Sequence, residues 1–129
     1  FEKKGGRSVA ALKQLASLEQ ELGKPVEAAA TLDRINYFYP SSDEELHRHL
    51  GDLWFEQKNY TGAVREYTAV VALQPLDKAT AQFNLARSYF AAGQKDQAEE
   101  HLLASLEAAP GYRPAQKLLL QLKDSNEGK

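Results

Sequence analysis

Apolar residues recur along this chain at intervals of three and four with polar residues between them, a spacing that predicts helices. The clearest stretch is 44–77, which splits into two helices because Lys58 and Asn59 interrupt the pattern. Pro75 ends the second helix, since proline has no backbone N–H to donate and restricts the residue before it. The apolar positions are Leu46, Leu50, Leu53, Trp54 and Phe55 in the first helix, and Ala63, Val64, Tyr67, Val70 and Val71 in the second.

The same two-helix pattern occurs three times, with a step of 35 residues. Pro40, Pro75 and Pro110 are separated by this step. The same step aligns Leu15 with Leu50 and Leu85, Ala16 with Gly51 and Ala86, Ala28 with Ala63 and Ala98, and Leu32 with Tyr67 and Leu102. Because so many positions match at one spacing, the chain contains an internal repeat.

Two local features refine the helices of the middle unit. Ser42 followed by Glu45 is a capping-box signature for the first helix, and Asn59 is a suitable N-cap for the second. Glycine inside a helix costs about 0.5–1 kcal/mol relative to alanine. We therefore expect Gly51 to lie where a neighbouring helix approaches closely; the alternative is that an isolated glycine is simply tolerated.

These residues resemble the tetratricopeptide repeat, a helix–turn–helix unit of about 34 residues. The resemblance implies an all-α fold, a right-handed α-solenoid of three such units with a C-terminal capping helix. The first unit has Glu19 where the others have Trp54 and Tyr89, so Leu18 and Leu22 are expected to take over the packing of that ring. The matching residues are Leu50-Gly51-x-x-Trp54, Ala63-x-x-x-Tyr67-x-x-Val70 and Pro75 in the middle unit, and Leu85-Ala86-x-x-Tyr89, Ala98-x-x-x-Leu102 and Pro110 in the third.

The expected organisation is a linker (1–8), a repeat domain (9–124) and a polar tail (125–129). The repeats are 9–42, 44–77 and 79–112, and a capping helix (113–124) covers the last of them, because a repeat array cannot leave its final apolar face bare. Leu120 lies off the apolar stripe of that helix. It is either a lone exposed leucine or a contact for self-association or another domain. The absence of an initial methionine suggests a fragment of a longer protein or a processed product.

Composition excludes several functions. Sixteen basic and eighteen acidic residues give a formal net charge of -2, which argues against nucleic-acid binding. No apolar run is long enough for insertion into a membrane. The chain has no cysteine, and its His and Asp/Glu residues do not form a convincing metal or catalytic set. We expect no cofactor and no metal, and we expect this chain to be non-catalytic; the sequence leaves open whether the full-length protein is an enzyme.

The resemblance instead implies a scaffold for protein–protein interaction, with the first helix of each unit lining a concave groove. A partner peptide or protein segment would lie in this groove. Its apolar side chains would pack on the phenylalanines, and its carboxylates would pair with Lys13, Arg48 and Arg87. Alternatively, the phenylalanines pack between repeats and the charges are merely solvated. Neither Arg48 nor Arg87 has an evident core role. The predicted binding residues are Lys13, Ser17, Glu21, Arg48, His49, Asp52, Glu56, Phe83, Asn84, Arg87 and Phe90, with Ala10, Gln14, Gln20, Glu45, Phe55, Thr80 and Ala91 on the same surface.

The resemblance raises two more specific interpretations. One subset of the family binds the carboxylate terminus of chaperone tails through Lys, Asn, Asn, Lys and Arg. Here Lys13 matches, but the other positions are Ser17, His49, Thr80 and Asn84, which argues against that specificity. The alternative function is a C-terminal accessory region of a larger enzyme, such as a peptidase or transferase, whose catalytic domain lies upstream.

Overall fold

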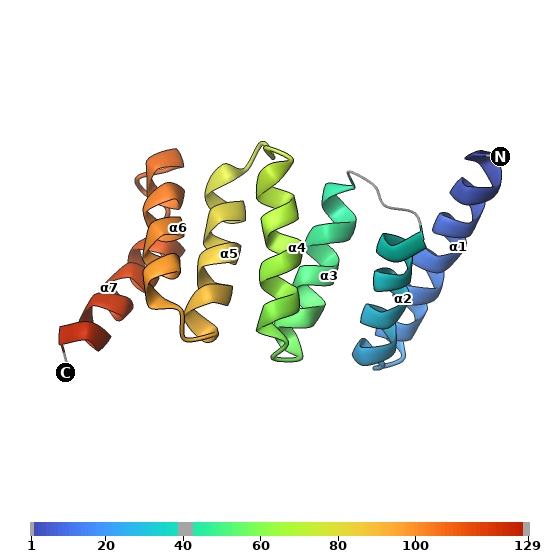
Figure 1. Cartoon of the computed structure of the whole chain (residues 1–129), viewed down its shortest axis with the longest axis horizontal. Helices are drawn as coiled ribbons and strands as arrows, with labels where there is room; N and C mark the ends of the chain where they lie inside the picture. Colours follow the sequence, from blue (N-terminus) through green and yellow to red (C-terminus); the bar gives the residue numbers. More distant parts are fainter. Residues whose placement is uncertain (1, 39–42, 128–129) are drawn as a thin grey trace.

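The structure of the protein, a computed structural model, describes residues 2–38 and 43–127. Within these ranges it consists of seven α-helices without a strand. Figure 1 shows them side by side along the long axis in chain order, with the termini at opposite ends. Three helix hairpins followed by a single helix confirm the expected fold class. The helices are α1 (Glu2–Glu21), α2 (Pro25–Phe38), α3 (Glu44–Glu56), α4 (Tyr60–Ala72), α5 (Lys78–Ala91), α6 (Lys95–Ala108) and α7 (Arg113–Glu127).

The turn inside each hairpin has the same backbone conformation. Gly23, Lys58 and Gly93, each 35 residues from the next, have φ angles of 75°, 63° and 84°. This left-handed region is open to glycine but costs energy for a residue with a Cβ atom. The 35-residue step therefore governs the backbone as well as the side chains, and Lys58 adopts a conformation that its two counterparts reach without strain.

Side-chain caps begin three of the helices. Asp43, Asn59 and Asp77 precede α3, α4 and α5, and each side chain accepts a hydrogen bond from the amide three residues further on. The predicted cap at Asn59 is confirmed. For α3 the capping residue is Asp43 rather than the expected Ser42; Ser42 itself, like Pro40, lies outside the described residues. Both neighbours are good caps by type, so the sequence alone did not distinguish them.

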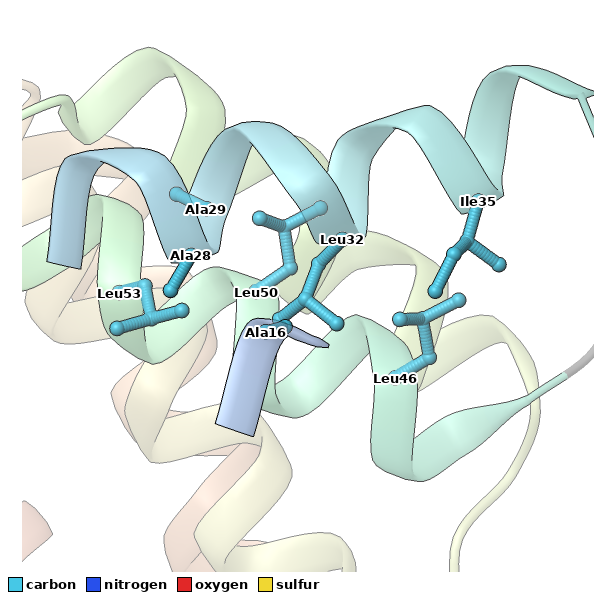
Figure 2. Packing of buried hydrophobic residues seen from close by; sticks show 8 residues of the cluster. All are labelled: Ala16, Ala28, Ala29, Leu32, Ile35, Leu46, Leu50 and Leu53. Carbon is cyan, nitrogen blue, oxygen red and sulfur yellow. The ribbon is translucent and has the colours of Figure 1, made fainter. Parts of the chain in front are cut away.

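The first hydrophobic cluster joins the first hairpin to α3 (Figure 2). Small residues of α1 and α2 allow the leucines of α3 to approach closely, and the eight side chains become inaccessible to water. Burial of this kind contributes the main favourable term in folding. The cluster consists of Ala16, Ala28, Ala29, Leu32, Ile35, Leu46, Leu50 and Leu53.

Gly51 lies against an aromatic ring, as a packing role for it requires. A Cβ atom at this position would be only 2.8 Å from Cε1 of Tyr67. Tyr67 in turn packs with Ala63 and Leu85 in a second cluster, which joins α3 and α4 to α5. The expected close approach of the two helices of the middle unit is therefore confirmed.

The last helix covers the third hairpin. Ala115 and Leu122 of α7 are fully buried with Ala86, Ala98 and Leu102. α7 continues to Glu127, so much of the expected tail is helical. Likewise α1 begins at Glu2, where a linker was expected. In both places polar residues extend a helix whose apolar residues further along are anchored by packing.

The expected packing of the first unit is wrong. Leu18 and Leu22 are 50% and 63% exposed. In place of an aromatic contact, Glu19 accepts a hydrogen bond of 2.6 Å from Thr31 Oγ1. The reason for the exposure is position: Leu53, the counterpart of Leu18, is buried under α2, whereas the described residues include no hairpin before α1.

Candidate functional site

The first helices of the hairpins, α1, α3 and α5, border two small hollows. One, of about 90 Å³, lies between α1 and α3. The other, of about 70 Å³, lies between α3 and α5. Each has room for a few water molecules or one small chemical group. The hollows and the exposed side chains of α1, α3 and α5 are referred to below as the groove. The lining residues are Lys13, Ser17, Leu32, Glu45, Leu46 and His49 in the first hollow, and Glu44, Arg48, Tyr67, Val70, Pro75, Asp77, Thr80, Ala81 and Asn84 in the second.

Five of the predicted binding residues meet at these hollows. Lys13, Ser17 and His49 line the first, and Arg48 and Asn84 line the second. Residues far apart in sequence come together here because each hairpin repeats the same register on the preceding one. His49 Nε2 also lies 2.7 Å from the side-chain oxygen of a glutamine on α1, so a hydrogen bond joins α3 to α1 across the first hollow.

Two of the groove cations are paired within the protein. Lys13 Nζ lies 2.5 Å from Asp43 Oδ2, and Arg48 Nη1 lies 2.7 Å from Glu44 Oε2 one helical turn away. Burial acts to raise the pKa of Asp43, but hydrogen bonds from Lys13 and from the Leu46 amide outweigh it and hold that pKa below its usual value of 3.8. Asp43 thus serves as helix cap and as counter-ion at once.

Arg87 occupies the centre of an interhelical network. Its guanidinium lies 4.0 Å from the centre of the Phe55 ring, donates a hydrogen bond of 3.1 Å to the Tyr67 hydroxyl, and lies 3.8 Å from Asp52 Oδ1. It also donates to Asn84 Oδ1 on its own helix at 3.2 Å. The expectation that Arg87 lacks a structural role is therefore wrong: it joins α3, α4 and α5.

The Tyr67 hydroxyl is a polar member of this network that sequence reasoning missed, because Tyr67 fits the apolar stripe of α4. The residue is 1% exposed, and its hydroxyl donates to Asp52. Burial raises the pKa of Tyr67 well above its usual value, and the neighbouring Asp52 carboxylate raises it further. The hydroxyl consequently stays protonated and acts as a fixed donor beneath the groove.

The phenylalanines of the groove are partly buried. Phe83 packs edge-to-face on Tyr112 of the α6–α7 connection, with ring centres 5.8 Å apart, and Phe55 packs likewise on Tyr60 at 5.3 Å. Phe90 packs against the cluster beneath α7. Their packing between elements is evident, and each of the three residues is partly buried rather than fully buried.

Glu21 and Glu56, the two remaining predicted residues, are exposed near the C-terminal ends of α1 and α3. They are one repeat step apart, and each lies four residues after a groove position, Ser17 or Asp52. Residues four apart share a helix face. The two carboxylates therefore occupy equivalent places at one edge of the groove.

Two larger hollows, each of about 430 Å³, lie between second helices. Asn36 and Ala69 line one, and Val71 and Ala104, each 35 residues later, line the other. The two hollows therefore lie at equivalent places in the stack, each in the seam between the second helices of successive hairpins. Because the stacking itself generates this seam, size alone does not single it out as a site.

A buried carboxylate beside this seam also escaped the sequence analysis. Glu66 is 3% exposed, and Asn36 and Arg65 donate hydrogen bonds to it at 2.9 and 2.8 Å, while His47 Nδ1 lies 2.8 Å away. The available signal was the repeat register, which puts polar residues at the equivalent positions of the other units. These contacts join α2, α3 and α4 and satisfy the carboxylate.

The described residues contain no group of three or more His, Cys, Asp or Glu side chains arranged to hold a metal ion. The described helices also include none with both the length and the apolar character required to cross a bilayer. The described side chains that line the groove are hydrogen-bonding groups, charged groups and aromatic rings.

Family models match most of this architecture. Two models, each described as tetratricopeptide repeat, match residues 13–78 and 55–122. The chain belongs to the tetratricopeptide repeat family. Tetratricopeptide repeats are typically non-catalytic interaction modules, and the family supports a protein-interaction scaffold. No match was found among curated proteins.

Solved structures with the same fold include complexes with peptides. The first tetratricopeptide domain of Spaghetti (RPAP3), bound to the HSP90 peptide SRMEEVD, has 19% identity and a TM-score of 0.75, with 94% of both chains covered. The second such domain of human RPAP3, in complex with an HSP70 peptide, has 16% identity and a TM-score of 0.76, with 92% of this chain and 98% of that chain covered. A Thermobaculum terrenum O-GlcNAc transferase mutant has 27% identity and a TM-score of 0.67, with 92% of this chain but 22% of that chain covered.

Proposed function

We propose that this protein is a non-catalytic scaffold that binds a segment of a partner protein in the groove on α1, α3 and α5. The observation that carries the proposal is the pair of hollows between consecutive first helices, lined by accessible polar side chains. Structural neighbours bound to peptides support peptides as the class of ligand.

The groove offers distinct contacts along its length. Ser17 and His49 at the first hollow and Asn84 at the second have hydrogen-bonding side chains, which suit the backbone or polar side chains of a bound segment. Phe83 and Phe90 provide ring surface at the third hairpin for apolar side chains. A chaperone-tail specificity is not part of the proposal, because only Lys13 matches that pattern and it is already paired with Asp43.

Site-specific photo-cross-linking tests the location. A photoreactive amino acid at Ser17 or at Glu56 lies in the groove, whereas the same label at Thr68 of α4 or Leu103 of α6 lies on the exposed side of a second helix. We expect one partner sequence to be captured from both groove positions and from neither control. Capture from Thr68 or Leu103 alone would place the binding surface on the second helices.

A second candidate is the accessory region of a larger enzyme. The similarity to a transferase at 27% identity, with only 22% of that chain covered, favours keeping this candidate. The sequence of the full-length gene product decides it: a catalytic domain upstream of these repeats would support the accessory role. In that case the groove would recruit the enzyme's substrate or partner, and deletion of the repeats would weaken substrate binding more than it slows the chemical step.

A further inference from the structure

The face formed by α1, α3 and α5 carries more acidic than basic groups among its described side chains. The basic ones are Lys13, Arg48 and Arg87, since Lys78 at the start of α5 lines a hollow between second helices instead. The whole chain is almost balanced at a formal net charge of -2. The excess is therefore local to the groove and not a property of the whole chain. The acidic side chains that line the hollows, contact these cations or share their face are Glu21, Asp43, Glu44, Glu45, Asp52, Glu56 and Asp77.

All three cations already lie within ion-pair distance of a carboxylate of the protein. Lys13 is paired with a carboxylate at 2.5 Å and Arg48 at 2.7 Å. Arg87 is held by a carboxylate, a hydroxyl and a ring face at once. An acidic ligand would have to share each cation with a carboxylate of the protein, which weakens its attraction to the groove relative to that of an unpaired cation.

Several acidic side chains of the groove have no cationic partner within the described residues. Glu21, Glu45 and Glu56 are exposed, and within the described residues none of them forms an ion pair. Glu45 lies at the first hollow beside Ser17 and His49, whose hydroxyl and imidazole add hydrogen-bonding capacity. These carboxylates can pair with ammonium or guanidinium groups without disturbing an existing contact.

We propose that the groove selects a partner segment rich in lysine or arginine, with its basic side chains at Glu21, Glu45 and Glu56 and its apolar side chains at Phe83 and Phe90. This inference rests on the proposed function and names the charge of its ligand. It reverses the sequence-based expectation that the groove cations meet carboxylates of the partner. The physical reason is that each cation already has a carboxylate partner within the fold, whereas Glu21, Glu45 and Glu56 form no ion pair within the described residues.

The test uses fluorescein-labelled peptides of one length that share the same leucines and differ only at their other positions, which are lysine, glutamine or glutamate. Fluorescence anisotropy measures their binding to the intact protein. We expect the lysine peptide to bind most tightly and the glutamate peptide most weakly. The preference should shrink on going from low salt to about 0.15 M salt, since salt screens exposed charges.

Matched variants locate the charges. Exchange of Glu21, Glu45 and Glu56 for Gln should weaken binding of the lysine peptide about tenfold, because each exposed ion pair contributes a modest factor. Exchange of Glu27, Glu100 and Glu107, which are exposed on second helices, for Gln removes the same net charge and should leave binding nearly unchanged. Circular dichroism verifies that both variants fold.

The outcomes separate this inference from the proposed function. If all three peptides bind equally well and the cross-linker at Ser17 captures them, the charge preference is overturned but the groove remains the binding surface. Tighter binding of the glutamate peptide, or equal weakening by both sets of substitutions, would also overturn it. Failure of every peptide to bind, together with no capture from Ser17 or Glu56, would count against the groove itself.

Discussion

At the scale of single residues, the smallest side chains determine how closely the helices pack. Gly51 leaves room for the Tyr67 ring. Ala63 of α4 is fully buried in the cluster that joins α3 and α4 to α5. Their positions follow from the 35-residue step, so the sequence predicted this part of the packing. What it did not predict is that the same ring carries a hydroxyl held by Asp52 and Arg87, because that contact requires three helices to be in place.

Exchange of Ala63 for Leu should lower the free energy of unfolding by about 1–3 kcal/mol, since the added atoms must displace packed neighbours. Ala30→Leu is the control, because Ala30 is exposed on α2 and a larger side chain there meets solvent. Its effect should stay within about 0.5 kcal/mol. Urea unfolding monitored by circular dichroism measures both. Equal stability of the Ala63→Leu variant and the parent would show that the register is misplaced.

The two groove arginines should differ in their contribution to stability. Arg87→Gln removes the contact with Phe55 and the ion pair with Asp52, so we expect a loss of about 1 kcal/mol or more. Arg48→Gln removes only an exposed pair within one helix and should cost less than about 0.5 kcal/mol. Thermal melts of the two variants make the comparison. Similar melting temperatures for both would mean that the network around Arg87 contributes nothing to folding.

At the scale of helices, the sequence predicted where α4 and α5 lie but misjudged the ends of the array. The periodicity of apolar residues fixes a helix that packs on both sides. It says little about α1 before residue 9 or α7 after residue 124, where polar residues extend the helix. Leu18 shows the same limit: its type suggests burial, but half of it is exposed, so residue type alone does not determine burial at the end of a stack.

Asp43→Ala should destabilise the protein by about 0.5–2 kcal/mol near neutral pH, through loss of the α3 cap and of the pair with Lys13. Because the pKa of Asp43 is lowered by folding, its contribution is present above its usual value of 3.8 and is lost as the pH falls through the lower folded value. The difference between parent and variant should therefore shrink when urea unfolding is repeated near pH 3.

Ser42→Ala is the matching control for that cap. If Asp43 caps α3, the Ser42 variant should lose less stability than the Asp43 variant near neutral pH. The reverse order would restore the capping box expected from the sequence. A difference for Asp43→Ala that does not change with pH would show that its carboxylate charge is not what stabilises the helix.

Two leucines of α7 separate its packing role from its surface. Leu122 is 1% exposed and Leu120 is 63% exposed. Leu122→Ala should cost about 2–5 kcal/mol and Leu120→Ala little. Deletion of residues 114–129 should lower the melting temperature and promote self-association, since it uncovers the third hairpin. A monomeric deletion variant as stable as the parent would show that α7 is dispensable.

Substitution of Leu120 tests whether the last helix mediates self-association of the intact protein. If it does, size-exclusion chromatography with light scattering should show a concentration-dependent oligomer that Leu120→Gln dissociates. A monomer for both proteins at all concentrations would leave Leu120 as an isolated exposed leucine, which is common on protein surfaces.

At the scale of the whole molecule, stacking converts a repeat in sequence into a continuous surface. The residues that the register assigned to the groove, such as Lys13, Arg48 and Asn84, do border its two hollows. The Glu44–Arg48 pair follows from its four-residue spacing, but the partners of Lys13 and Arg87 come from the neighbouring hairpin and were not readable from sequence. The proposed function therefore depends on whether a ligand contacts α1, α3 and α5 together.

Hydrogen–deuterium exchange of the intact protein, with and without the partner segment identified by cross-linking, tests that claim most directly. The groove predicts slower exchange in α1, α3 and α5 around Ser17, His49 and Asn84, with α2, α4 and α6 little changed. Protection confined to the second helices, around Thr68 and Leu103, would contradict it and move the binding surface to the opposite side of the stack.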